Sequence, residues 1–211
     1  MNKNFTEIDL ITLLCSKLCH DLINPISAAL NGCEMIDENI NDETNSLAGS
    51  LVRESLKRAS SQIGLYRVAF GVVRGVKTSF MEEELLKILN SYNDNKKIKL
   101  DLEIDKNDLN IESTRLILNL YLVSLQLLPR GGSILISNKN SIIQSTCSGD
   151  YLATFNDISD IFKSKDIEIN DIDIKLIQIL FTKLIAEQAA KSIFIKQLDG
   201  GEGIAVKIKS L

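Results

Sequence analysis

Apolar residues in the first third of the chain recur at the spacing of an α-helix. Between Glu7 and about Ile36 they form one stripe at intervals of three and four, made of Ile11, Cys15, Leu18, Leu22, Ile26, Ala29, Cys33 and Ile36. A second stripe with the same spacing is made of Val52, Ser55, Ala59, Ile63, Tyr66, Phe70 and Val73. The polar segment from Ile36 to Ser46 separates the two stripes as a turn. The pattern predicts two long helices in an antiparallel hairpin.

A single hairpin cannot cover the apolar stripes of both its helices, because each helix shields only one side of the other. A second copy of the chain would complete a four-helix bundle and bury both stripes. The sequence therefore predicts a homodimer.

Beyond about residue 78 the pattern changes to shorter helices and strands. A helix is predicted over 81–89 and another over 113–128, where a strongly apolar run ends in Pro129, Arg130 and two glycines. Alternation and turn residues predict the remaining elements, which are strands over 97–104, 133–137, 141–148 and 151–155, an acidic turn-like segment over 156–173, a long helix over 171–191 and a strand hairpin over 192–211.

Helices packed on one face of a mixed sheet make an α+β sandwich. The predicted fold class is thus α+β, with a helical hairpin in a dimeric four-helix bundle over residues 1–76 and an α/β sandwich over residues 77–211. The sequence has no internal repeat and no low-complexity linker, so we expect a tight boundary near residues 75–80.

The composition is that of an ordinary globular protein, with 45% hydrophobic and 25% charged residues among 211. Lysine and arginine number 24 against 28 acidic residues, a net charge of −4, which argues against nucleic acid as a partner. No run of 18 apolar residues and no signal peptide occur, so we expect a cytoplasmic protein with no membrane partner.

The four cysteines and the single histidine do not form a metal pattern. Cys15 and Cys19 are four residues apart and His20 is adjacent to Cys19, so their side chains point in different directions and lack further ligands. We expect no metal site, and reduced cysteines packed within helices.

The one histidine, His20, lies on the opposite side of its helix from the apolar stripe. At about 100° per residue it falls about 165° from the centre of the stripe, so it faces solvent. An exposed neutral imidazole is a nucleophile at physiological pH, which makes His20 a candidate phosphoryl acceptor. Candidate contacts for a docking partner on the same face are Leu13, Ser16, Lys17, Asn24 and Ser27.

Two residues near His20 bear on this chemistry. Asp21, about 100° round the helix, is placed to accept a hydrogen bond from Nδ1 and so leave Nε2 free to attack, although a solvated helix charge explains it equally well. Pro25 has no amide hydrogen, so the carbonyl of Asp21 loses its helical partner and a bend is expected there.

The residues 18–25, LCHDLINP, resemble the H-box of two-component histidine kinases, in which an acidic residue and a more distant proline follow the phosphoacceptor histidine. The longer stretch LLCSKLCHDLINPISAALNGCEMI more closely resembles the alphaproteobacterial ChpT family of histidine phosphotransferases, as does LNLYLVSLQLLPRGGSILIS, the counterpart of the kinase N-box helix and the strand after it. The resemblance covers nearly the whole chain, is loose from Ser141 to Asp173, and implies that the second domain is a degenerate, Bergerat-like kinase ATPase domain.

An ATP site of the kinase type requires motifs that this chain lacks. Asn119 stands where the first N-box asparagine is expected, but Val123 replaces the metal-binding asparagine four residues later. No DxGxG motif occurs, and no glycine-rich loop precedes the final helix. We therefore expect no cofactor of its own and no ATP binding, with Mg²⁺ supplied by the acidic pocket of a partner receiver domain.

Together these features predict a histidine phosphotransferase with His20 and Asp21 as its catalytic residues. It would take phosphate from the receiver domain of a hybrid histidine kinase and pass it to downstream response regulators; the resemblance further implies that the degenerate domain offers receivers a second contact surface. Two alternatives are an active ATP-dependent histidine kinase core and a dimeric module that binds receivers or kinases without catalysis.

Overall fold

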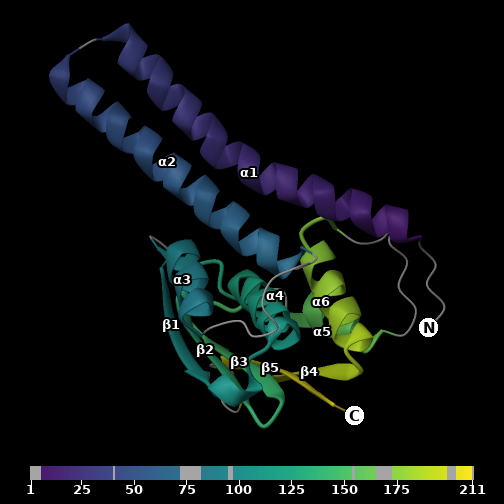
Figure 1. Cartoon of the computed structure of the whole chain (residues 1–211). Coiled ribbons are helices and arrows are strands. Elements are labelled where there is room, and N and C mark those ends of the chain that lie inside the picture. The colour runs from purple at the N-terminus through teal and green to yellow at the C-terminus, as the bar shows by residue number, and fades with distance from the viewer. Residues whose placement is uncertain are drawn as a thin grey trace.

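Two long antiparallel helices form a hairpin that stands on an α/β layer (Figure 1). The computed structural model describes residues 6–39, 41–71, 82–94, 97–153, 155–164, 173–198 and 203–210. Helix α1 spans Glu7–Glu38 and helix α2 spans Asp42–Ala69. The end of the hairpin that carries the loop projects well beyond the sheet, while the other end lies over the helices of the layer (Figure 1).

The turn of the hairpin is shorter than the sequence predicts. Asn39 ends α1 in the left-handed conformation with φ 49°, and the Asn41 side chain caps α2 by accepting from the amide of Thr44 at 2.8 Å. Asp42 and Glu43 then lie in the first turn of α2, where acidic side chains favour the positive end of the helix dipole. The polar residues after Asn41 are therefore helical, and not part of the turn.

The contact between α1 and α2 uses small residues. On α1 it buries Pro25, Ala29 and Gly32, and a Cβ atom added to Gly32 would lie 2.7 Å from Cγ2 of Val52. Glycine is thus required for this close approach of the two helices. Helix α1 runs unbroken through Pro25, whereas α2 ends at Ala69, short of the predicted Val73, which lies outside the described residues.

The apolar stripe predicted for α1 is wider than the surface that α2 covers. Leu18 and Ala29 face the interior, but five members of the stripe are exposed, namely Ile11, Cys15, Ile26, Cys33 and Ile36. The hairpin therefore leaves a large part of its apolar surface uncovered. The predicted homodimer depends on such an uncovered surface.

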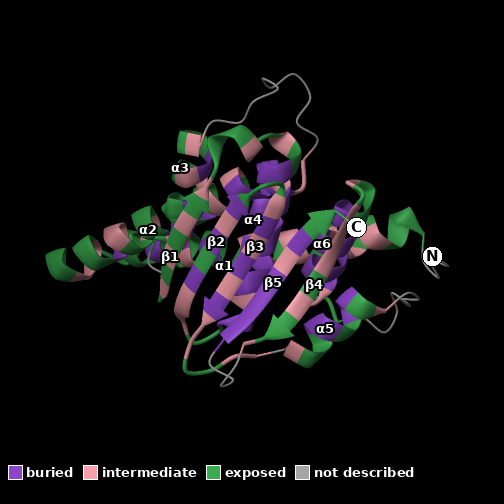
Figure 2. Ribbon diagram, turned by 90° about the horizontal axis from the view of Figure 1, so that it is seen from below, coloured by how far each residue is buried: buried purple, intermediate pink, exposed green. Residues whose placement is uncertain are grey.

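Five strands form one mixed sheet in the order β1-β2-β3-β5-β4. Their bounds are Ile98–Ile104, Gly132–Lys139, Ile142–Ser148, Lys191–Gln197 and Gly203–Ser210 for β1 to β5. Strands β1 and β2 are parallel and the other pairs are antiparallel. The view from below shows the open face of the sheet, with the helices behind it (Figure 2).

Helices α3 (Glu82–Asn93), α4 (Ile111–Leu127), α5 (Phe155–Lys163) and α6 (Ile177–Gln188) cover the other face, and a 3₁₀ turn spans Lys106–Asp108. Helix α4 contacts β2 and β3 on one side and α2 and α6 on others, so it is buried on nearly every side. This explains the absence of a polar face between Leu116 and Ser124. The α+β fold class is confirmed.

Helix α4 ends at a tight turn that only glycine can make. Gly131 has φ 97°, and a Cβ atom there would lie 2.3 Å from the carbonyl oxygen of Lys97. The stop predicted from Pro129 to Gly132 is thus correct, and β2 begins at Gly132 beside β1.

The segment between β3 and α6 departs from the prediction. Residues 151–153 form no strand, and the acidic residues from Asn156 onward form helix α5 in place of a turn. Its apolar residues Ile158, Ile161 and Phe162 are buried, and the buried amine of Lys183 on α6 donates to the carbonyls of Ile161, at 2.9 Å, and Ser164. Helix α5 is thus stabilised by burial of its apolar side and by the contact of Lys183 with its C-terminal carbonyls. Neither contribution can be read from the acidic composition of the segment.

Helix α6 begins at Ile177, later than the predicted 171, after a turn over residues 174–176. Strands β4 and β5 pair as the predicted C-terminal hairpin, whose turn lies mostly outside the described residues. The boundary predicted near residues 75–80 also lies outside them. In the part of the chain that the structure covers, no helix has both the length and the apolar character needed to cross a membrane.

Candidate functional site

His20 lies on the outer edge of α1, and its side chain is 75% exposed, as the helical phase predicts. Ser16, Asn24 and Ser27 on the same edge are also exposed. Because small and polar groups surround it, the imidazole is open to a large partner.

The carboxylate of Asp21 is held more firmly than that of a solvated helix charge. Its side chain is only 22% exposed, and Oδ2 accepts hydrogen bonds from Lys17 Nζ at 2.9 Å and from the hydroxyl of Tyr66 at 2.8 Å. The other oxygen, Oδ1, lies 3.7 Å from His20 Nδ1, slightly beyond hydrogen-bond range. A tightening of about 1 Å on partner binding would complete a hydrogen bond to the imidazole.

Tyr66 belongs to α2 and is buried beneath the site. Its ring packs against Phe70 and Tyr92, with centroid distances of 5.5 and 6.4 Å, and Tyr92 packs against Tyr121 at 6.1 Å. Burial, with the neighbouring Tyr92 and Asp21, raises the pKa of Tyr66 far above its ordinary value, so the hydroxyl stays protonated and donates.

Sequence reasoning assigned Tyr66 only to the apolar stripe of the second helix and missed its contact with Asp21. A signal was present, because a buried tyrosine hydroxyl needs a polar partner. The partner itself was not predictable, since it lies 45 residues away.

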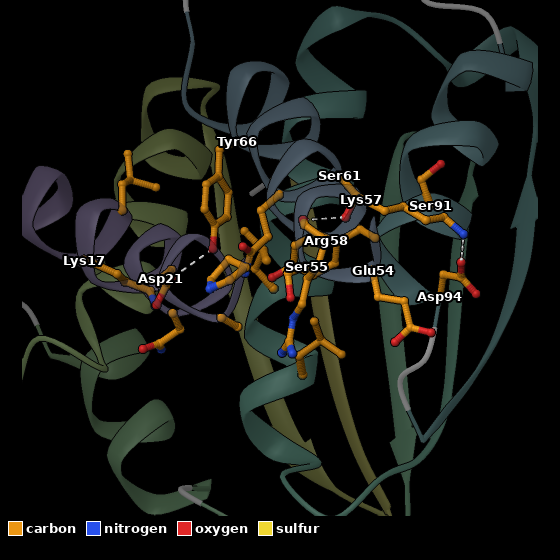
Figure 3. Close-up of a pocket in the computed structure, with 18 of the residues that line it drawn as sticks. Lys17, Asp21, Glu54, Ser55, Lys57, Arg58, Ser61, Tyr66, Ser91 and Asp94 are labelled. Atoms are coloured by element: carbon orange, nitrogen blue, oxygen red, sulfur yellow. Dashed lines mark hydrogen bonds and ion pairs between the residues drawn. The ribbon is translucent and has the colours of Figure 1, made fainter. Parts of the chain in front are cut away.

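A groove of about 730 Å³ opens beside the site, between the hairpin and helices α3 and α4 (Figure 3). Its lining includes Lys17, Asp21 and Asn24 from α1. Lys57 from α2 and Asp94 at the end of α3 form an ion pair across it (Figure 3). His20 is not part of the lining, but its sequence neighbour Asp21 and the residue one turn on, Asn24, both are.

The structure separates the five predicted partner contacts into two kinds. Ser16, Asn24 and Ser27 are exposed beside His20. Lys17 is half-buried and paired with Asp21, and Leu13 is half-buried and packs against the core. Lys17 and Leu13 therefore already have contacts within the chain, and all five residues remain predicted partner contacts.

The side of the hairpin that faces away from the groove carries an exposed apolar surface. We call it the apolar face; its large residues are Ile8, Ile23, Ile26, Leu30, Leu56 and Ile63, each between 45% and 73% exposed. On both helices these residues lie about 60° to 150° from the buried contact in the same rotational sense, which places them on one side of an antiparallel pair.

Three cysteines are exposed on this helical surface, which corrects the prediction that all four pack within helices. Cys15, Cys19 and Cys33 are exposed and Cys147 is buried, and none of the four forms a disulfide. Among the described residues, no three His, Cys, Asp or Glu side chains gather to hold a metal ion.

Asn119, the counterpart of an N-box asparagine, is committed to the protein's own packing. It is fully buried, and its amide nitrogen donates to the carbonyls of Ala69 and Arg115, both at 2.8 Å. Its oxygen accepts from Gln178 Nε2 at 2.7 Å. Asn119 thus ties α4 to the end of α2 and to α6, and it does not fit a role as a ligand for Mg²⁺ or nucleotide.

Val123 strengthens this point, because it is fully buried where a metal-binding asparagine was expected. Close to Asn119, which bonds to Ala69 and Arg115, Phe70 and Phe181 pack with ring centroids 5.2 Å apart and Arg115 lies over Phe181. The end of the hairpin is therefore packed onto α4 and α6 by aromatic contacts.

Comparison with known proteins supports this description. The family model for the histidine phosphotransferase C-terminal domain matches residues 82–201. The chain is 29% identical over 194 residues to protein phosphotransferase ChpT of Brucella abortus (strain 2308), covering 90% of this chain and 91% of that protein. A solved structure of a bacterial phosphotransferase, at 28% identity, covers 97% of this chain and 98% of the other with a TM-score of 0.83. The chain belongs to the histidine phosphotransferase family.

Proposed function

We propose that the chain is a phosphorelay intermediate in which His20 carries the phosphoryl group. It accepts phosphate from the receiver domain of a hybrid histidine kinase and delivers it to a response regulator. The observation that carries the proposal is the 75% exposed imidazole of His20 beside the held carboxylate of Asp21. The sequence contains one histidine, so no second imidazole competes for the role.

The reaction requires only a nucleophile and a nearby carboxylate from this chain. Nε2 of His20 attacks the phosphorus of the aspartyl phosphate in line, the bond from phosphorus to the aspartate oxygen breaks, and the receiver's carboxylate leaves. Nδ1 keeps its proton throughout, and Asp21 faces the positive charge that develops on the ring. The second transfer runs the same steps in reverse onto another aspartate. Any Mg²⁺ is supplied by the receiver's own acidic pocket.

A receiver docks over the outer edge of α1 in this proposal. Ser16, Asn24 and Ser27 are exposed around His20 and form the centre of the contact. The neighbouring groove extends the same surface toward α3, because Ser91 and Asp94 line its far side. These residues are the candidates for the second contact surface on the C-terminal part.

A homodimer is the second part of the proposal. The apolar face lies opposite the groove, so a second copy can cover it while both His20 side chains stay open. Isologous packing of two such faces gives a four-helix bundle, which buries both faces with only two copies of the chain. We place this dimer in the cytoplasm.

We also propose that the protein does not phosphorylate itself from ATP. The side-chain amide of Asn119 donates to the Ala69 carbonyl and accepts from Gln178, so it is not available to a nucleotide. The side chain of Val123 is buried and has no atom that could bind a metal ion. The acidic segment that lacks the glycines of a DxGxG motif forms helix α5. These observations support a domain in which the positions that bind nucleotide in a kinase contribute to internal packing.

This assignment of Asn119 predicts an outcome in thermal unfolding. Asn119→Ala removes the 2.8 Å bond to the Ala69 carbonyl and the 2.7 Å bond from Gln178, which keep only longer bonds to Arg115 and Thr182 at 3.2 and 3.4 Å. We therefore expect a loss of about 2–4 kcal/mol of stability. ATP with Mg²⁺ should not raise the melting temperature of the wild-type protein, because a ligand stabilises only a fold that binds it. A rise with ATP, together with an unchanged Asn119→Ala melting temperature, would support the autokinase alternative.

The relay itself is tested with two receivers. A receiver carrying labelled aspartyl phosphate is mixed with a second receiver, with and without a catalytic amount of this protein. We expect label to reach the second receiver only when the protein is present, through an intermediate that is stable in alkali and labile in acid. Binding of receivers without any labelled intermediate would instead identify a non-catalytic module.

A further inference from the structure

The two oxygens of the Asp21 carboxylate have different surroundings. Oδ2 is fully engaged, with Tyr66 and Lys17 donating to it at 2.8 and 2.9 Å. Oδ1 points toward Nδ1 of His20 at 3.7 Å. Two donors on Oδ2 restrict rotation of the carboxylate, so they favour the orientation in which Oδ1 faces His20.

Of these two donors, Tyr66 is the more restrictive. Lys17 lies one turn before Asp21 on the same helix, and an i,i+4 ion pair on a flexible side chain restrains its partner only weakly. Tyr66 reaches Asp21 from the other helix, and Figure 3 shows its hydroxyl directed at the carboxylate. Its ring is buried between Phe70 and Tyr92, so its position is fixed by packing.

The packing behind Tyr66 continues into the C-terminal part of the chain. Tyr92 lies on α3 and packs against Tyr121 of α4. The Tyr121 hydroxyl donates to Asn93 Oδ1 at 2.8 Å, and Asn93 in turn donates to the carbonyl of Ile98, where β1 starts. A continuous set of packed and hydrogen-bonded groups thus connects the sheet to the neighbour of the phosphoacceptor.

The direction of Oδ1 matters because a neutral imidazole has two tautomers. Attack by Nε2 requires the proton on Nδ1, and an acceptor facing Nδ1 selects that tautomer. An exposed histidine with no such acceptor would spend part of its time with Nε2 protonated and unreactive.

We propose that Tyr66 is a positioning residue for phosphotransfer, which holds Asp21 so that Oδ1 faces Nδ1 of His20 and keeps Nε2 free. This inference rests on the function proposed above for His20. It also assigns a role to the C-terminal part of the chain, because α3 and α4 pack behind Tyr66 and fix its position. This role does not require a bound nucleotide.

The tautomer can be measured without any partner. The chain has one histidine, so ¹⁵N-histidine labelling of a tag-free protein gives the two ring nitrogens of His20 alone. When the imidazole is neutral, we expect wild type to carry its proton on Nδ1. Tyr66→Phe, which removes only the hydroxyl, should shift the population toward protonated Nε2. Asp21→Asn should shift it the same way, and the double variant should show no further change.

Tyr121→Phe is the matched control, because it also removes one hydroxyl that donates at 2.8 Å but keeps the ring that packs against Tyr92, the contact through which α4 supports Tyr66. Its tautomer and transfer rate should match wild type, whereas Tyr66→Phe should transfer roughly tenfold more slowly. Because the Tyr66 hydroxyl does not titrate in the working range, that ratio should stay constant from about pH 6 to about pH 9.

A wild-type tautomer in Tyr66→Phe overturns the inference, even if transfer slows, because the role of Tyr66 would then be structural. An equal slowing in Tyr121→Phe overturns it too. Failure of wild type to accept phosphate from any receiver is a different result, since it rejects the proposed function and leaves the tautomer comparison to be judged separately.

Discussion

Replacement of His20 by alanine is expected to abolish phosphotransfer, with a fall of at least about a thousandfold in the labelling of the protein by a phosphorylated receiver. The imidazole is the only nitrogen nucleophile of its kind in the sequence, so no other side chain can form the same acid-labile phosphoramidate. Asp21 cannot replace it, because a carboxylate would form an acyl phosphate and not an acid-labile phosphoramidate.

The fold should not change in this variant. The His20 side chain is 75% exposed, so the substitution is expected to alter stability by no more than about 0.5 kcal/mol. His20→Ala should therefore melt like wild type and still bind receivers, and binding is measured in parallel with label transfer. Label on the alanine variant would show that the phosphoacceptor lies elsewhere.

The second large effect is expected from a charge on the apolar face. Ile26 is 45% exposed in the single chain and lies near the middle of this face. In the proposed bundle, Ile26→Asp would bury two unpaired carboxylates, at a cost of several kcal/mol each. We expect light scattering to give about twice the 23.5 kDa chain mass for wild type and one chain mass for the variant.

Leu47→Asp provides the matched control for this experiment. Leu47 is 64% exposed on α2 but lies on the opposite side of that helix from Leu56 and Ile63, so the same charge should leave the dimer intact. If wild type is a monomer at micromolar concentration, or if Ile26→Asp stays dimeric, the apolar face is not the interface.

The two experiments also separate the parts of the proposal. A monomeric Ile26→Asp protein that still accepts phosphate would show that each hairpin carries a complete site. The geometry favours this outcome, because Lys17, Asp21 and Tyr66 all come from one chain.

Features that follow from local periodicity could be predicted from the sequence. The hairpin, helix α4, the stop at Gly131 and the C-terminal strand pair all depend on spacing and on turn residues. The exposure of His20 belongs to the same group, since the phase of a helix is fixed by residues within a few turns.

Helix α5 and the true width of the α1 stripe required the tertiary structure. In α5, the acidic residues hide an apolar side that is stable only because Ile158 and Phe162 are buried against neighbouring elements, and because Lys183 caps its end. In α1, the split between a buried contact and an exposed face depends on where α2 lies, which no local pattern records.

The sequence by itself determined that this chain has one exposed imidazole in a helical hairpin and lacks the motifs of a nucleotide site. Only the tertiary structure decided what surrounds that imidazole and which groups Asn119 contacts. Tyr66 meets Asp21 across 45 residues, and Asn119 meets Gln178 across 59. Contacts at such separations arise from the packing of whole elements. A local sequence pattern can therefore indicate that a buried polar group needs a partner, but it cannot identify the residue that supplies it.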